Sequence, residues 1–161
     1  MKNIIYKPIG IIHSQNKTPE GTPIQASSAK DIKGVIELYP EFIDGLTDLD
    51  EFSHIILLYH FHLSKEAKLI SKPFMDDVSH GVFATRAPSR PNHIGISYAK
   101  IEKIEGNKIF VNGIDIVDGT PLLDIKPYVP QFDYNKVEKI GWLNKNVRKL
   151  PEAKDDGRFV K

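Results

Sequence analysis

The sequence contains no cysteine, so it forms no disulfide and offers no thiol as a nucleophile or metal ligand. A Gly-x-Ser-x-Gly motif is also missing, which argues against a serine hydrolase. Neither a Walker motif nor the Gly-x-Gly-x-x-Gly loop of a Rossmann domain is present. No run approaches the roughly 18 apolar residues of a membrane-spanning helix. We therefore expect a cytoplasmic protein that has no membrane association and binds no metal.

Positive and negative side chains are also nearly equal in number. The 161 residues include 22 Lys or Arg and 21 Asp or Glu, which gives a formal net charge of +1. The chain as a whole thus exerts no long-range attraction on nucleic acid, and any such binding must come from a local patch. This length is sufficient for one domain with one sizeable core.

Short apolar and β-branched segments dominate the rest of the chain. Seven of them read as strands, over 4–14, 33–39, 54–62, 81–85, 94–104, 108–117 and 122–129. Glu105-Gly106-Asn107 is a good hairpin turn between two of these strands. This pattern predicts a mainly β protein, either a barrel or a sandwich.

The best helix candidate comes near the end of the chain, over 135–149. Asn135 is its expected cap, and an apolar stripe at helical spacing supports it: Val137, Ile140, Leu143 and Val147. The charged segment 151–161 is expected to be a mobile tail. These features divide the chain into a β domain over 1–135 and a C-terminal helix and charged tail over 136–161.

The run from Gly81 to Gly95 carries two arginines where apolar segments end. Arg86 and Arg90 each offer a rigid fork of donors for a carboxylate or phosphate, and two prolines stiffen the loop between them. The alternative is that both arginines pair with acidic residues and brace a turn. The long polar loop over 15–31 is the other segment that we expect to serve binding.

Histidines and carboxylates supply the other candidate groups. His60 and His62 point to one side of a strand, so they either share a metal ion or pack in the core, and no third ligand completes a metal site. Asp118 is expected to close a turn. Asp115 and Asp124 lie in strands, where each carboxylate needs a partner: a structural cation or a cationic or hydroxyl-bearing ligand.

Four segments, taken together, make the chain resemble the TsaA-like (TrmO) family, whose characterised members methylate tRNA. They are GIIHS within 9–14, DLDEFSHIILLYHFH, GVFATRAPSRPNHIGIS and DIVDGTPLLDIKPYVPQFD. The resemblance covers residues 6–133. It implies a single-sheeted β-barrel that forms a homodimer and binds S-adenosylmethionine (AdoMet). The implied enzyme methylates the exocyclic amine of (threonylcarbamoyl)adenosine beside the anticodon of tRNA.

The same resemblance implies which residues form the site. Those expected to contact AdoMet are Gln25, Ala26, Ser27, His62, Leu63, Arg86, Ile96, Ile114, Asp115, Ile116 and Val117. Those expected to face the anticodon stem-loop are Arg90, Asn92, Lys126 and Tyr128. Because an aryl amine is a poor nucleophile, a proton acceptor would help, and the candidates are Asp118, Asp124 and Tyr128.

The sequence leaves two other functions open. One is a barrel that binds AdoMet or a nucleotide without turnover, and the other is a metal-dependent enzyme that uses His60 and His62. The chain departs from the family pattern at Ala26-Ser27-Ser28, where many members have Pro-Gly after the glutamine. Better-studied bacterial members also carry a second, C-terminal domain.

Overall fold

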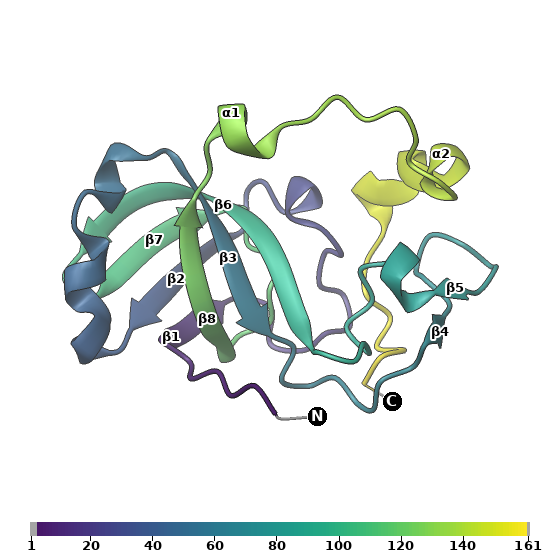
Figure 1. The fold of residues 1–161 in the computed structure, drawn as a ribbon, viewed down its shortest axis with the longest axis horizontal. Helices are drawn as coiled ribbons and strands as arrows, with labels where there is room; N and C mark the ends of the chain where they lie inside the picture. The colour runs from purple at the N-terminus through teal and green to yellow at the C-terminus, as the bar shows by residue number, and fades with distance from the viewer. Residues whose placement is uncertain (1–2, 161) are drawn as a thin grey trace.

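The computed structural model describes residues 3–160, and six antiparallel strands in it close into one barrel (Figure 1). The strand order around the barrel is β1-β2-β7-β6-β3-β8, and pairing of β1 with β8 closes it. The prediction of a mainly β, single-sheeted barrel is confirmed. The strands are β1 Gly10–Ser14, β2 Lys33–Leu38, β3 His54–His60, β6 Ile94–Glu105, β7 Lys108–Asn112 and β8 Thr120–Pro127.

Short elements occupy the two ends of the barrel. The 3-10 helices η2 (Pro40–Leu46) and η3 (Leu49–Glu51) lie at one end. At the other end lie the small hairpin of β4 (Ile70–Ser71) and β5 (His80–Gly81), and α2 (Leu143–Asn146) (Figure 1). The remaining elements are η1 Ala26–Ser28, η4 Val82–Ala84, α1 Pro130–Asp133 and η5 Val147–Glu152.

The barrel interior is filled by alternate residues of the strands, as the period of two in a β-strand requires. Side chains with no exposed surface come from five of the six strands, and they are Ile12, Ile36, Ile55, Leu57, Ile109 and Leu122. Their burial supplies the hydrophobic free energy that holds the sheet closed.

Several predicted strands are shorter in the structure, for identifiable reasons. The strand expected over 108–117 ends at Asn112, because Gly113 has a φ of +92°, which extended backbone does not adopt. The first strand begins at Gly10 rather than at residue 4, after Pro8, which has no backbone N–H to give to a sheet. The segment 81–85 is not a strand: after β5 it forms η4.

The predicted helix over 135–149 is wrong. Only Leu143–Asn146 is α-helical, and η5 follows it. Gly141 has a φ of +59°, a left-handed conformation that a right-handed helix cannot contain. Part of the apolar stripe is solvent-exposed, with 66% of Val137 and 42% of Ile140 accessible, so no packing holds this segment in a helix.

The expectation of a mobile tail is also wrong for the part of the tail that the structure describes. Asp155 forms two backbone hydrogen bonds with the loop after β1: its N donates to Thr22 O (2.9 Å) and its O accepts from Gly21 N (2.7 Å). Phe159 is buried, and its ring packs edge-on against Phe74. Met1, Lys2 and Lys161, which the predicted domain limits include, lie outside the described residues. The division of the chain after residue 135 stays a prediction.

Within residues 3–160, no helix has both the length and the apolar character that crossing a membrane would require.

Candidate functional site

A cavity of about 530 Å³ opens beside the barrel, at the end that carries the C-terminal segment. Its walls come from the end of β3 and the residues after it, the start of β6, the loop before β6, and the segment after β7. This volume lies in the range of sites that hold a cofactor or a drug-sized ligand. The barrel thus supplies a rigid wall, and the loops supply polar groups.

The C-terminal segment forms the outer wall of this cavity. Leu143, Val147 and Leu150 line it from α2 and η5. Trp142 fixes this wall in place: its Nε1 donates to Ala84 O at 2.8 Å, and its ring stacks on that of His80. The segment that the sequence predicted as a separate helix and tail is therefore part of the site.

Three side chains form a directed hydrogen-bond chain at the cavity wall. Ser97 Oγ donates to Asp115 Oδ1 at 2.6 Å, which uses the only proton of the hydroxyl. The Tyr59 hydroxyl lies 3.2 Å from Ser97 Oγ, so it must be the donor in that contact. Tyr59 and Asp115 both line the cavity. The hydrogen bonds run from Tyr59 to Asp115, so the carboxylate at the end of the series faces the site.

Burial shifts the pKa values of the two ionisable groups in this hydrogen-bond chain. It raises the pKa of Asp115 to about 6, while the bond from Ser97 and the field of Arg86 act in the opposite direction. Burial also raises the pKa of Tyr59, and the nearby Asp115 adds to that rise, so the phenol stays neutral. A buried carboxylate with a pKa of about 6 is ionised at neutral pH, and it can then neutralise the charge of a cationic ligand.

The Tyr59 ring takes its position because Gly95 has no side chain. The two residues are paired across β3 and β6. A Cβ atom at Gly95 would overlap the Tyr59 ring and press on Phe61. Gly95 therefore places the aromatic wall of the cavity as well as the start of the hydrogen-bond chain.

Arg86 faces the same cavity from the loop before β6. Its Nη1 donates to Gln25 Oε1 at 2.8 Å, and it has no carboxylate partner among the described residues. The other donors of the guanidinium therefore remain available for an anionic group. Arg86 is solvent-exposed, so the alternative of an arginine buried in a structural ion pair does not hold here.

His62 lines the cavity at the end of β3. Burial lowers its pKa, and the neighbouring His60 adds to this, so the imidazole is neutral near pH 7. Its Nδ1 lies 3.4 Å from Thr120 Oγ1, whose proton goes to Val117 O. Nδ1 must therefore donate in this contact, which leaves Nε2 as a proton acceptor.

Most residues expected to contact AdoMet line the cavity together. They are Gln25, His62, Leu63, Arg86, Ile96, Asp115, Ile116 and Val117. Three do not: Ala26 and Ser27 lie in η1, and Ile114 is fully buried in the barrel core. Of the residues expected to face RNA, Arg90 lines the cavity, whereas Asn92, Lys126 and Tyr128 do not. Sequence reasoning missed Tyr59, Ser97 and Trp142.

None of the three predicted proton acceptors lines the cavity, and their roles remain a prediction. Asp118 accepts from Lys17 Nζ (2.8 Å) and Ser14 N (3.0 Å), which lowers its pKa. Asp124 Oδ2 lies 2.7 Å from Lys126 Nζ, so its partner is the structural cation. The Tyr128 ring packs edge-on against Tyr98.

His60 and His62, the two histidines considered as metal ligands, make different contacts in the structure. His60 stacks on His93, with 5.9 Å between the ring centres, whereas His62 faces the cavity. In the part of the chain that the structure describes, no three His, Cys, Asp or Glu side chains gather where they could hold a metal ion.

Comparison with known proteins identifies relatives of the whole barrel. The family described as the tRNA-methyltransferase O N-terminal domain matches residues 11–134. A Pyrococcus abyssi protein named "Probable S-adenosyl-L-methionine-binding protein" is 60% identical over 97% of this chain and 85% of its own length. The mouse protein named tRNA (adenine(37)-N6)-methyltransferase is 36% identical over 96% of this chain and 37% of its own.

A solved structure shows the same fold. The crystal structure of TrmO from Pseudomonas aeruginosa superposes with a TM-score of 0.73 and 38% identity, covering 88% of this chain and 63% of that one. The chain therefore spans about a third of the length of the mouse enzyme and less than two thirds of the bacterial structure.

Proposed function

The chain belongs to the family of the tRNA-methyltransferase O N-terminal domain, and on this premise we propose that it transfers a methyl group from AdoMet to tRNA. The acceptor is the exocyclic amine of the (threonylcarbamoyl)adenosine beside the anticodon. The resemblance seen in the sequence is confirmed by the family match and by relatives named as tRNA (adenine(37)-N6)-methyltransferases. The observation that carries the proposal is the cavity in which Arg86 and Asp115 present opposite charges.

The groups in the cavity fit AdoMet. Its methionine end carries a carboxylate, an ammonium and a positive sulfur, and its other end is a nucleoside. Arg86 offers a guanidinium for the carboxylate, and Asp115 offers a carboxylate for the positive groups. Aromatic and aliphatic side chains, among them Phe61 and Ile96, supply apolar surface for the adenine ring.

When bound, AdoMet supplies a methyl group that its positive sulfur already activates. The cavity residues must then hold the acceptor amine in line with that methyl group and exclude water. Methylation of the nitrogen releases one proton. We assign its acceptance to His62, a neutral base that lines the cavity, ahead of the three acceptors proposed from sequence.

One experiment tests the activity directly. Purified protein, AdoMet and tRNA from cells that lack the gene are incubated, and the nucleosides are analysed by mass spectrometry. We expect several methyl groups transferred per protein molecule, all on the proposed adenosine. His62→Gln should lower kcat, while His54→Gln, which changes an exposed histidine at the start of β3, should leave it unchanged.

A second function is favoured by the name of the Pyrococcus abyssi relative, which describes a probable AdoMet-binding protein. In that case the barrel binds AdoMet without turnover. Tight AdoMet binding with no label on any RNA would replace the enzyme by this binding module, and repeated turnover would exclude the module.

We also propose that the chain forms a homodimer through the outer face of β3 and β6. Ile94, Ile96 and Tyr98 alternate outward on β6 and are each about 40% exposed. Ile94 and Ile96 also line the cavity, so a second copy on this face would border the AdoMet site. Tyr98→Glu should halve the mass measured by light scattering.

The proposed substrate places the protein in the cytoplasm.

A further inference from the structure

The near-neutral total charge conceals a separation of charge along the chain. Residues 136–161 contain eight Lys or Arg and four Asp or Glu, a formal charge of +4. Residues 1–135 contain 14 Lys or Arg and 17 Asp or Glu, which gives a formal charge of −3. A local basic region is the condition under which a protein of small net charge attracts a polyanion.

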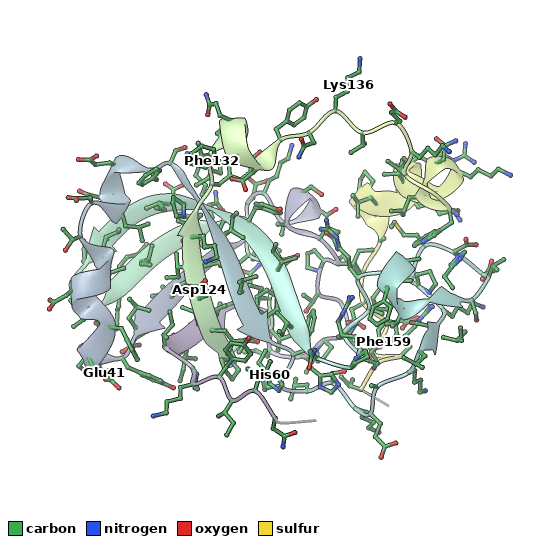
Figure 2. The ribbon with its side chains drawn as sticks, in the orientation of Figure 1. Glu41, His60, Asp124, Phe132, Lys136 and Phe159 are labelled. Carbon is green, nitrogen blue, oxygen red and sulfur yellow. The ribbon has the colours of Figure 1, made fainter. Side chains whose placement is uncertain are left out.

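The densest acidic segment of the chain lies at the end of the molecule opposite α2. The 40–51 segment, which covers η2 and η3, carries five Asp or Glu residues and no Lys or Arg. Figure 1 shows these helices at the end of the barrel farthest from α2, and Figure 2 shows Glu41 projecting from them. Such a dipole repels a polyanion at one end and orients it toward the other, where the cavity opens.

The wall formed by α2 and η5 has two different faces. Leu143, Val147 and Leu150 line the cavity. Lys145, Arg148 and Lys149 are exposed to solvent. We call these three residues the basic face. It lies on the same short segment as the cavity wall, so a ligand bound to it is held next to the site.

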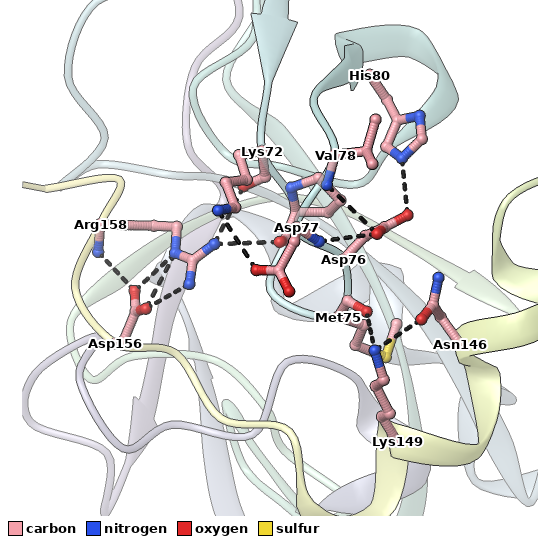
Figure 3. Close-up of polar contacts among 11 residues, drawn as sticks. Lys72, Met75, Asp76, Asp77, Val78, His80, Asn146, Lys149, Asp156 and Arg158 are labelled. Carbon is pink, nitrogen blue, oxygen red and sulfur yellow. Dashed lines mark hydrogen bonds and ion pairs between the residues drawn. The ribbon is translucent and has the colours of Figure 1, made fainter.

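Within residues 3–160, no carboxylate lies within ion-pair distance of the basic face. Among the described residues, neither Lys145 nor Arg148 has an ion-pair partner. Lys149 Nζ donates to Met75 O (3.0 Å) and Asn146 Oδ1 (2.7 Å), both uncharged acceptors (Figure 3). No carboxylate of the described residues therefore competes with an external anion for these three side chains.

Several cations elsewhere on the molecule are paired. Lys100, Lys103, Lys108 and Lys126 on the barrel strands each lie within 4 Å of a carboxylate. Lys72 and Arg158, beside the basic face, pair with Asp77 and Asp156 (Figure 3). Arg86 and Arg90 line the cavity, and like the basic face they have no carboxylate within ion-pair distance among the described residues.

From these observations we propose that the basic face binds the phosphate backbone of the RNA substrate and presents its target nucleotide to the cavity. The inference rests on the proposed function, because it takes RNA as the polyanion. Lys126, which was expected to face the RNA, is paired with Asp124. The inference assigns the phosphate contacts to the C-terminal segment instead. Phosphate contacts of this kind fix the position of a nucleic acid without reading its sequence.

The test compares two double variants that each remove two positive charges. Lys145→Gln/Arg148→Gln changes the basic face and leaves Lys149, which braces α2, in place. Lys7→Gln/Lys33→Gln is the matched control, because both lysines are exposed and unpaired among residues 3–160 and neither lines the cavity. Binding of tRNA from cells lacking the gene is measured against salt concentration, with AdoMet binding measured alongside.

We expect the basic-face variant to bind tRNA about tenfold more weakly and to show a smaller salt dependence. Its slope of log K against log salt should fall by about 1.4 to 1.8, since each lost phosphate contact accounts for about 0.7 to 0.9. The KM for tRNA should rise, while kcat and the Kd for AdoMet stay at wild-type values. The control variant should keep the wild-type slope.

Three results would overturn the inference. Equal slopes in the two variants, with wild-type protein still methylating tRNA, would reject the basic face and leave the proposed function intact. A change in oligomeric mass in the basic-face variant alone would make this face a subunit contact. Wild-type protein that binds AdoMet but no tRNA would reject the RNA half of the proposed function and this inference with it.

Discussion

The Ser97 hydroxyl donates to the Asp115 carboxylate across 2.6 Å, and this bond joins an inward-facing residue of β6 to the wall of the cavity. Burial makes the charged form of Asp115 costly, and the bond from Ser97 offsets part of that cost. The balance leaves the Asp115 pKa at about 6. A cation bound at this site would therefore stabilise the ionised form of the Asp115 carboxylate.

The first prediction concerns the pH dependence of AdoMet binding. Asp115 is ionised above its pKa of about 6 and protonated below it, and a cationic ligand favours the ionised form. By linkage, AdoMet should bind about tenfold more weakly at pH 5 than at pH 7. Asp115→Asn should bind weakly at both values, with little change between them. Isothermal titration calorimetry across this range gives the comparison.

His62 is the control for that prediction, because it also titrates in the acidic range and lines the cavity. His62→Gln should retain the pH dependence of AdoMet binding. If the dependence disappears in His62→Gln and persists in Asp115→Asn, the histidine controls cofactor affinity and the role given to Asp115 is wrong.

The second prediction is that Ser97→Ala shifts this pH profile. Removing the hydroxyl takes away the bond that lowers the Asp115 pKa, so the midpoint of AdoMet binding should move to higher pH. Tyr59 would lose its acceptor, and the unfolding free energy should fall by about 1 to 3 kcal/mol. Ser71→Ala, at a buried serine outside the cavity, should leave the midpoint unchanged. An unchanged midpoint in both variants would contradict the proposed hydrogen-bond chain.

The third prediction is that Gly95→Ala damages both stability and AdoMet binding. The added Cβ overlaps the Tyr59 ring, so the ring must move and the unfolding free energy should fall by about 1 to 3 kcal/mol. Displacement of Tyr59 and Phe61 should also weaken AdoMet binding, as titration calorimetry would show. Gly45→Ala is the matched control, because nothing lies within 4 Å of its new Cβ, and it should change neither quantity. Equal behaviour of the two variants would show that the ring position does not depend on Gly95.

The barrel was predictable because alternation of apolar residues is a local signal. The pattern of β2 and β7 sets which side chains point inward, and the turn at Glu105-Gly106-Asn107 pairs β6 with β7. The resemblance then identified Arg86 and Asp115, which the fold brings to one cavity. Ser97 was missed because the apolar residues of this part of β6, Ile94, Ile96 and Tyr98, face outward, so apolar alternation assigns the serine to the wrong face.

The C-terminal segment could not be predicted from its local pattern. Its apolar spacing satisfies a helix, but Val137 and Ile140 remain exposed to solvent, whereas Leu143, Val147 and Leu150 line the cavity. The backbone turns at Gly141 so that Trp142 reaches Ala84 O. These contacts depend on loops far away in the sequence, and they override the helical propensity of the segment.

The last prediction is that Ser71→Ala stabilises the protein. Ser71 in β4 is 5% exposed, and its Oγ has no hydrogen-bond partner among the described residues. A buried hydroxyl without a partner costs free energy that alanine avoids, at the loss of only one atom from the packing. The unfolding free energy should rise by about 1 kcal/mol, which raises Tm by about 2 to 4 °C in a chain of this size. Thermal unfolding followed by circular dichroism measures the change, and a lower Tm would mean that the hydroxyl is bonded in solution.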